Sequence, residues 1–112
     1  MTECLFCRIA AREAPADIVY EDDDLVAFRD IHPKYQVHFL LIPKVHVASV
    51  ADVKKEHEPL LGKILRVSGE LARQYGLSES GFRVLMNTGP DAGQVIAHLH
   101  LHVLGGERLR AI

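Results

Sequence analysis

The sequence lacks a basic cluster and a long apolar run. Its 13 Lys and Arg face 15 Asp and Glu, which gives a formal net charge of −2, and the basic residues are spread along the chain. A chain without a basic patch has no general attraction for a polyanion, so we expect no nucleic acid polymer as a partner. No stretch reaches the roughly 18 apolar residues of a membrane span, so we expect no membrane partner either.

The N-terminus lacks the pattern of an export signal. Met1-Thr2-Glu3-Cys4 has no basic segment and no apolar core follows it, so we expect a cytoplasmic location. The chain has only two cysteines, Cys4 and Cys7, in a C-x-x-C spacing. In a reducing compartment this spacing favours a metal site or a redox pair over a structural disulfide.

No repeat, low-complexity segment or linker divides the chain. Its 112 residues, 48% of them apolar, are enough for one compact core and too few for two ordinary domains. We therefore predict a single domain over residues 1–112.

The apolar spacing predicts an α+β fold. Helical spacing indicates a short helix over residues 4–12 and a long helix over residues 58–75. Short apolar runs, two of them flanking an acidic hairpin turn, indicate strands. They cover residues 18–20, 25–28, 38–43, 82–86 and 97–104. We predict an antiparallel sheet of about five strands with the helices packed on one face.

The last predicted strand carries three alternating histidines, His98, His100 and His102. Successive side chains of a strand point to opposite faces, so the three imidazoles would share one face. Imidazole alone has an ordinary pKa between about 5 and 8, which suits nucleophiles, proton carriers and metal ligands. Two chemistries are open on this evidence: a catalytic metal site, and covalent catalysis in which a neutral imidazole attacks phosphorus.

The loop before this strand favours the phosphorus chemistry. Gly89 and Gly93 allow the backbone to approach a ligand closely and to direct amide N–H groups at phosphate oxygens. Asn87 and Gln94 add polar contacts. An ordinary turn between strands also explains two glycines, so the loop alone does not decide the chemistry.

Several motifs together resemble the histidine-triad (HIT) superfamily. The run from His98 to Leu104 is similar to its signature of three histidines alternating with apolar residues. The resemblance spans about Phe6 to Gly106, and the other motifs point to the histidine-triad nucleotide-binding branch. Those motifs are residues 28–31, residues 38–44, Asn87, Gly93-Gln94 and Gly105-Gly106.

The resemblance implies a HIT-like fold and a hydrolase of nucleotide derivatives. Such an enzyme cleaves purine nucleoside 5′-phosphoramidates, or related nucleoside phosphate derivatives, through a covalent nucleotidyl-histidine and releases the nucleoside monophosphate. His100 would be the nucleophile, and His102 and His38 would assist through hydrogen bonds to the phosphate and leaving group. No metal would be required for catalysis. A homodimer formed through the long helix and an edge strand is also implied.

The same resemblance implies a nucleotide-binding site. The carboxylate of Asp30 would accept both ribose hydroxyls, and apolar side chains would line the base pocket. The expected substrate-binding residues are Phe6, Ile9, Phe28, Asp30, Ile31, Asn87, Gly93, Gln94, His100 and His102. Two positions depart from the family pattern and bear on specificity, since Val95 replaces a common hydroxyl and Ala97 a common tyrosine. His32, before Pro33, is expected at the solvated surface.

A structural zinc is implied as well. In cysteine-bearing relatives of this superfamily, the C-x-x-C pair, a later histidine and the first triad histidine hold the ion. The corresponding residues here are Cys4, Cys7, His46 and His98, a closed set without an open position for substrate. The spacing of the cysteines alone supplies only half a tetrahedral site, so two buried thiols and a surface His46 remain an alternative.

Two other functions remain open at this stage. The triad histidines would be the ligands of a catalytic zinc in a zinc-dependent hydrolase, and chelation would then abolish turnover. A non-catalytic module that binds a nucleotide or a partner would be favoured if His100 cannot react.

Overall fold

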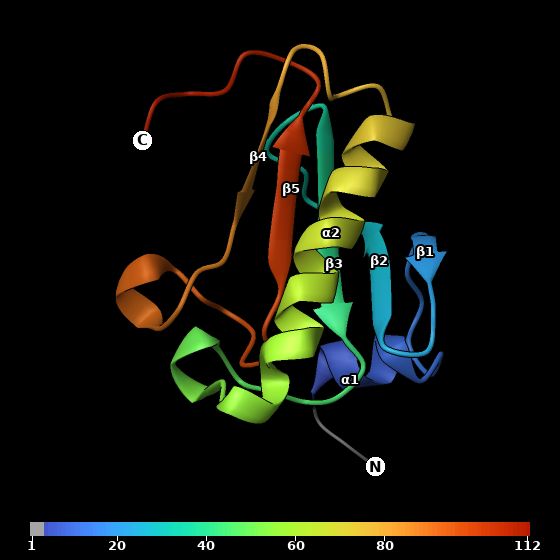
Figure 1. The fold of residues 1–112 in the computed structure, drawn as a ribbon, viewed down its shortest axis with the longest axis vertical. Coiled ribbons are helices and arrows are strands. Elements are labelled where there is room, and N and C mark those ends of the chain that lie inside the picture. Colours follow the sequence, from blue (N-terminus) through green and yellow to red (C-terminus); the bar gives the residue numbers. More distant parts are fainter. Residues whose placement is uncertain (1–3) are drawn as a thin grey trace.

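The computed structural model describes residues 4–112, which form a five-stranded antiparallel sheet with a long and a short helix (Figure 1). The strands are β1 (Ile18–Glu21), β2 (Leu25–Arg29), β3 (Val37–Pro43), β4 (Phe82–Leu85) and β5 (Leu101–Gly105). The helices are α1 (Leu5–Ala10) and α2 (Glu58–Gln74). The strand order β1-β2-β3-β5-β4 confirms the predicted α+β class.

The long helix follows the apolar stripe of its sequence. Pro59 lies in its first turn, where a missing N–H costs nothing, and Gly76 follows its end at φ +76°, a backbone conformation that suits glycine. The buried face is made by Ile64, Val67, Ser68, Leu71 and Ala72. Within the described residues 4–112, no helix has both the length and the apolar character that crossing a bilayer requires.

The two helices cover opposite faces of the sheet. Along β2, Leu25 and Ala27 belong to the core cluster that includes α2, whereas Val26 and Phe28 pack with α1. In Figure 1, α2 runs across β3, with which it makes direct contact. The prediction that both helices pack on one face was wrong. Strands that are apolar on both faces need cover on both sides.

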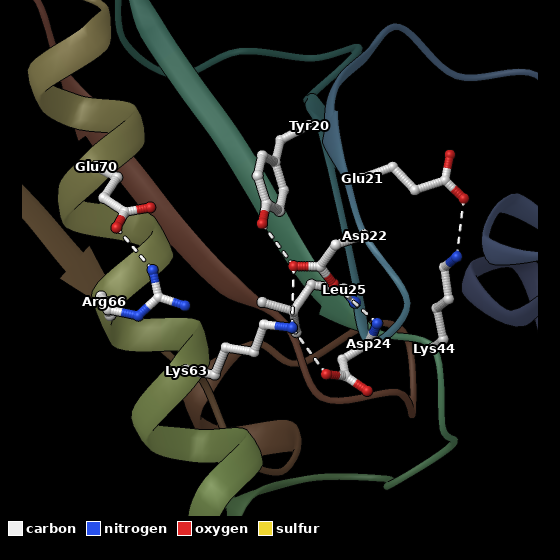
Figure 2. Close-up of polar contacts among 9 residues, drawn as sticks. All are labelled: Tyr20, Glu21, Asp22, Asp24, Leu25, Lys44, Lys63, Arg66 and Glu70. Atoms are coloured by element: carbon white, nitrogen blue, oxygen red, sulfur yellow. Dashed lines mark hydrogen bonds and ion pairs between the residues drawn. The ribbon is translucent and has the colours of Figure 1, made fainter.

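The hairpin turn between β1 and β2 is tied to α2 (Figure 2). Asp22 accepts hydrogen bonds from the backbone N–H groups of Asp24 and Leu25 at 2.8 and 2.9 Å, and from the Tyr20 hydroxyl at 2.5 Å. The Lys63 ammonium lies 3.0 Å from Asp22 and 2.7 Å from Asp24. Burial acts to raise the pKa of Asp22, but these hydrogen bonds together hold it well below its ordinary value.

The last strand begins at Leu101, so its predicted start at residue 97 was wrong. The β3–β5 register pairs Leu41 with Leu101, and its continuation would place Pro43 opposite Leu99. Proline has no N–H to donate to a ladder, and the Leu99 N–H donates instead to the Val47 carbonyl at 2.6 Å. His98 and His100 therefore lie in the irregular segment before β5. Only His102 of the three lies in the strand.

Candidate active site

A cavity of about 500 Å³ opens on the sheet face that α1 covers. Phe6 and Ile9 of α1 form part of its wall, together with Phe28 of β2, and these three side chains belong to one core cluster. His100 and His102 also line the cavity. An apolar cavity of this size with a few polar groups is typical of a site for a small ligand.

The cavity collects nearly all of the predicted substrate-binding residues. Its lining includes Phe6, Ile9, Phe28, Asp30, Ile31, Asn87, Gly93, His100 and His102. Gln94 is the exception. Its amide accepts from the Gly89 N–H at 2.9 Å and donates to the Ala48 and Ile96 carbonyls at 2.8 and 3.0 Å, so this side chain braces the loop.

Sequence reasoning missed several residues of the wall. His32 lines the cavity, although it was expected only at the solvated surface. Leu40 also lines it, and its pairing with Phe28 across β2 and β3 could have been inferred from the two strand patterns. The loop of residues 14–16 has no comparable signal, because its position depends on how the chain returns from α1 to the sheet.

His100 has a defined proton position. Its Nδ1 lies 2.7 Å from the backbone carbonyl of His98, and a carbonyl can only accept, so Nδ1 carries the proton. In the neutral ring the lone pair is then on Nε2. Phe6 packs edge-on against the ring, with centroids 5.1 Å apart. In that tautomer the ring presents an unshared electron pair at Nε2, the feature that a nucleophilic imidazole needs.

Hydrogen bonds place the proton of His102 on the other ring nitrogen, Nε2. The Lys34 N–H donates to His38 Nδ1 at 3.1 Å, so His38 carries its proton on Nε2. His38 Nε2 lies 2.9 Å from His102 Nδ1 and donates to it, which leaves the His102 proton on Nε2. That nitrogen is buried and has no hydrogen-bond partner among residues 4–112. His102 can therefore offer an N–H to a ligand oxygen.

Burial keeps both of these rings neutral. It lowers the pKa of His102 to about 4, with smaller contributions from the neighbouring His100 and His38. Burial also lowers the pKa of His38, and the nearby Asp30 opposes that shift. The hydrogen bonds between neutral rings are thus consistent with the electrostatics at neutral pH.

Asp30, directly after β2, connects the cavity to His38. One carboxylate oxygen accepts from the His32 N–H at 2.8 Å, and the other lies 3.4 Å from His38 Nε2. The Asp30 side chain is 21% exposed and lines the cavity, so a bound ligand can reach it. His38 is buried behind His102 and is not part of the cavity wall.

The four predicted metal ligands come together beside α1. The ligand atoms of Cys4, Cys7, His46 and His98 all lie within 4.8 Å of one another. His98 Nδ1 is 3.3 Å from Cys4 Sγ, 3.5 Å from Cys7 Sγ and 3.2 Å from His46 Nδ1. Tetrahedral zinc with ordinary bond lengths places its ligand atoms about 3.3–3.8 Å apart. The cluster therefore fits a tetrahedral metal ion.

The ring of His98 is oriented for this cluster. Its Nε2 lies 2.8 Å from the Pro43 carbonyl and must donate to it, so the lone pair on Nδ1 faces the other three ligands. Burial lowers the pKa of His98, against the effect of the Pro43 hydrogen bond. A neutral imidazole held by a backbone carbonyl is what a metal ligand requires.

A catalytic zinc held by all three triad histidines does not fit the geometry. His98 belongs to the cluster with the cysteines, and no cluster of potential ligands within residues 4–112 contains His98, His100 and His102 together. Asp30, His38 and His102 form a second group of suitable atoms, but the two rings are already joined by a hydrogen bond. We assign that group to hydrogen bonding.

The sequence matches a known domain family. A family model for the HIT domain covers residues 11–109. The protein HitA of Neisseria gonorrhoeae is 50% identical over 105 residues, which span 94% of this chain and 97% of that protein. The purine nucleoside phosphoramidase of Escherichia coli K12 is 46% identical over 107 residues, or 96% of this chain and 90% of that enzyme.

Solved structures agree with this match. A HIT family hydrolase from Legionella pneumophila Philadelphia 1 superimposes with a TM-score of 0.95 at 45% identity, and 96% of each chain is covered. A Zn-bound histidine triad family protein from Mycobacterium smegmatis gives a TM-score of 0.81 at 33% identity, with 96% of this chain and 80% of that one covered. The resemblance that the motifs indicated is confirmed.

Proposed function

The chain is a nucleotide hydrolase of the HIT domain family, and we propose that it cleaves purine nucleoside 5′-phosphoramidates. The relative named purine nucleoside phosphoramidase supports this substrate class. The product is the nucleoside 5′-monophosphate. We assign the reaction to one domain over residues 1–112 in the cytoplasm.

The reaction proceeds in two displacements at phosphorus. His100 Nε2 attacks, the P–N bond breaks, and the amine leaves after taking up a proton from solvent, so that a nucleotidyl-imidazole remains. Water then attacks the same phosphorus and releases a proton to solvent, the bond to Nε2 breaks, and neutral His100 is restored with the monophosphate. His102 donates its Nε2–H to a phosphate oxygen in both steps, where charge accumulates.

The observation that supports this proposal most is that two neighbouring imidazole rings carry their protons on different nitrogens. His100 keeps its lone pair on Nε2 because Nδ1 donates to the His98 carbonyl. His102 keeps its proton on Nε2 because Nδ1 accepts from His38. A nucleophile and a donor therefore lie side by side, with ring centroids 5.0 Å apart, in the wall of one cavity.

The nucleoside would occupy the apolar part of the cavity. Phe6, Ile9, Phe28 and Ile31 would contact the base, and Asp30 would accept from the ribose hydroxyls. Asn87 and Gly93 would lie near the phosphate. Gln94 acts by holding their loop.

A zinc ion fits the Cys4, Cys7, His46 and His98 cluster, and we assign it a structural role. Its coordination would fasten the start of α1 to the segment that precedes β5. No step of the hydrolysis uses this ion, because the set has no open position for substrate.

A second copy of the chain would cover an apolar groove at the edge of the sheet. The edge strand β4 borders this groove, and Leu65 of α2 lines it with 54% of its surface exposed. Two copies related by a two-fold axis would bury both grooves, as the homodimer implied by the family requires. Leu65→Glu should give monomers in sedimentation, whereas Val45→Glu, at equal exposure elsewhere, should not. A monomeric wild type would contradict the dimer.

The activity is tested with a fluorogenic adenosine phosphoramidate. Wild type should turn it over equally with and without a chelator in the assay, and should form a covalent adenylyl adduct detectable by mass spectrometry after acid-free quenching. His100→Ala should bind adenosine monophosphate and lose turnover. Binding by wild type without turnover or adduct would instead favour the binding module, and loss of initial turnover on chelation would favour the zinc hydrolase.

A further inference from the structure

Two acceptor atoms lie near the single N–H of His38. Its Nε2 lies 2.9 Å from His102 Nδ1 and 3.4 Å from a carboxylate oxygen of Asp30. Its other nitrogen already accepts from the Lys34 N–H, so the neutral ring has no second proton to give. One N–H can make one full hydrogen bond, and a carboxylate is a stronger acceptor than a neutral imidazole nitrogen. Asp30 therefore competes with His102 for His38.

The outcome of this competition changes what His102 presents to the cavity. When His38 donates to His102 Nδ1, the His102 proton stays on Nε2, a buried nitrogen that has no other partner among residues 4–112. When His38 donates to Asp30, His102 Nδ1 loses the donor that held the proton on Nε2, and the proton position is no longer fixed. A lone pair on Nε2 would repel a phosphate oxygen, whereas an N–H stabilises it.

A ribose with both hydroxyls would resolve the competition. Asp30 is reachable from the cavity, and one of its oxygens is already held by the His32 N–H. A hydroxyl that donates to the other oxygen satisfies it and weakens its attraction for His38. The His38 N–H is then left to His102.

We propose that His38 is a positioning residue that couples ribose binding at Asp30 to the proton position of His102, so that a substrate with a cis-diol is cleaved faster as well as bound more tightly. This inference rests on the proposed function, because it concerns the same cavity. It assigns to the sugar a role in the chemical step, and it explains why a buried histidine lies between the carboxylate and the phosphate donor.

Steady-state kinetics on two substrates test the coupling. The substrates are a fluorogenic adenosine phosphoramidate and its 2′,3′-dideoxy analogue. For wild type, kcat on the dideoxy substrate should be about tenfold lower, in addition to a higher KM, since partial loss of one phosphate donor costs less than the roughly hundredfold of a complete loss. A role in binding alone would raise KM and leave kcat unchanged.

Asp30→Ala supplies the sharper comparison. It removes the competing acceptor, so KM for the ribose substrate should rise while the ratio of the two kcat values falls to about one. In this variant kcat on the dideoxy substrate should exceed that of wild type. Asp30→Asn keeps an oxygen for the His32 N–H and should give the same ratio, which controls for a disturbed loop.

Nitrogen NMR of the histidine rings reads the proton position without turnover. In wild type with adenosine monophosphate, His102 Nε2 should show the shift of a protonated ring nitrogen. With the 2′,3′-dideoxy monophosphate its shift should move toward that of an exchange-averaged nitrogen. Equal kcat values and equal shifts for the two sugars would overturn the coupling and leave the hydrolase intact. Absence of all turnover would overturn the hydrolase, and the NMR comparison would still decide the coupling.

Discussion

The backbone carbonyl of His98 accepts from His100 Nδ1 at 2.7 Å, while the ring of His98 belongs to the metal-ligand cluster. One residue thus takes part in two sites, through different atoms. Because the carbonyl belongs to the main chain, it survives removal of the side chain. The two roles can therefore be separated by mutation.

His98→Ala should lower stability far more than it lowers the chemical competence of His100. The change removes a fully buried ring and one of four metal ligands, so we expect a loss of about 3 kcal/mol or more in unfolding free energy, together with loss of bound zinc. Urea unfolding and elemental analysis measure these effects. His32→Ala, at an exposed position, is the matched histidine control and should change stability by less than about 0.5 kcal/mol. An unchanged zinc content in His98→Ala would contradict the ligand assignment.

Stability should fall as the pH is lowered from neutral, and His102 should contribute to that fall. The ordinary pKa of histidine, about 6.5, applies to the unfolded chain, whereas burial lowers the pKa of folded His102 to about 4. Between these values the unfolded state binds a proton that the folded state does not, so acid favours unfolding until the pH reaches the lower value. Above about 6.5 the contribution is fully present.

Urea unfolding from pH 7.5 to pH 5 measures this dependence. His102→Gln removes the titrating ring and should give a shallower decline, while a part of the slope should remain because the pKa of buried His38 is also lowered. Identical slopes for the two proteins would show that His102 is not buried in its neutral form.

Asp22→Ala should loosen the hairpin from the long helix. The carboxylate accepts two backbone N–H groups and the Tyr20 hydroxyl, and contacts Lys63, so we expect a loss of about 1–3 kcal/mol in unfolding free energy (Figure 2). Arg66→Ala breaks only an exposed ion pair with Glu70 on the same helix. It should cost about 0.3–0.5 kcal/mol, and an equal effect of both variants in urea unfolding would refute the special role of Asp22.

Val95→Ser should change catalysis without changing stability. Val95 lines the cavity and is 92% exposed, so little apolar packing is lost. The new hydroxyl can donate to the phosphate or the leaving group, and we expect kcat/KM to rise about threefold to tenfold. Val95→Ala removes the same methyl groups without adding a donor. If the alanine variant gains as much as the serine variant, the effect is steric and the expected hydrogen bond does not form.

Local patterns were sufficient for elements that depend on their own residues. The stripe on α2, with Pro59 at its start and Gly76 after its end, predicted the helix to within about a residue. The short apolar runs of β2 and β3 predicted the strands, but the apolar residues on both of their faces also require the helices to divide between the faces.

The predicted start of β5 was wrong because a partner far along the chain decides it. The start of β5 depends on Pro43 in a neighbouring strand, a residue more than fifty positions away. The proton position of His38 depends on the backbone N–H of Lys34, which a turn brings to the ring. A sequence motif can identify such a histidine, but it does not show which group will hydrogen-bond to its ring.

Pro43 shows how a residue acts on chemistry that it does not touch. Lacking an N–H, it ends the hydrogen-bonded ladder before the segment of His98 and His100, and its carbonyl then holds the His98 ring. If the two strands stayed paired along this segment, their main-chain groups would hydrogen-bond to each other. Those groups would then be lost as partners for the side chains. The ladder between β3 and β5 thus ends early, and the main-chain carbonyls of Pro43 and His98 are left to orient the imidazole rings of His98 and His100.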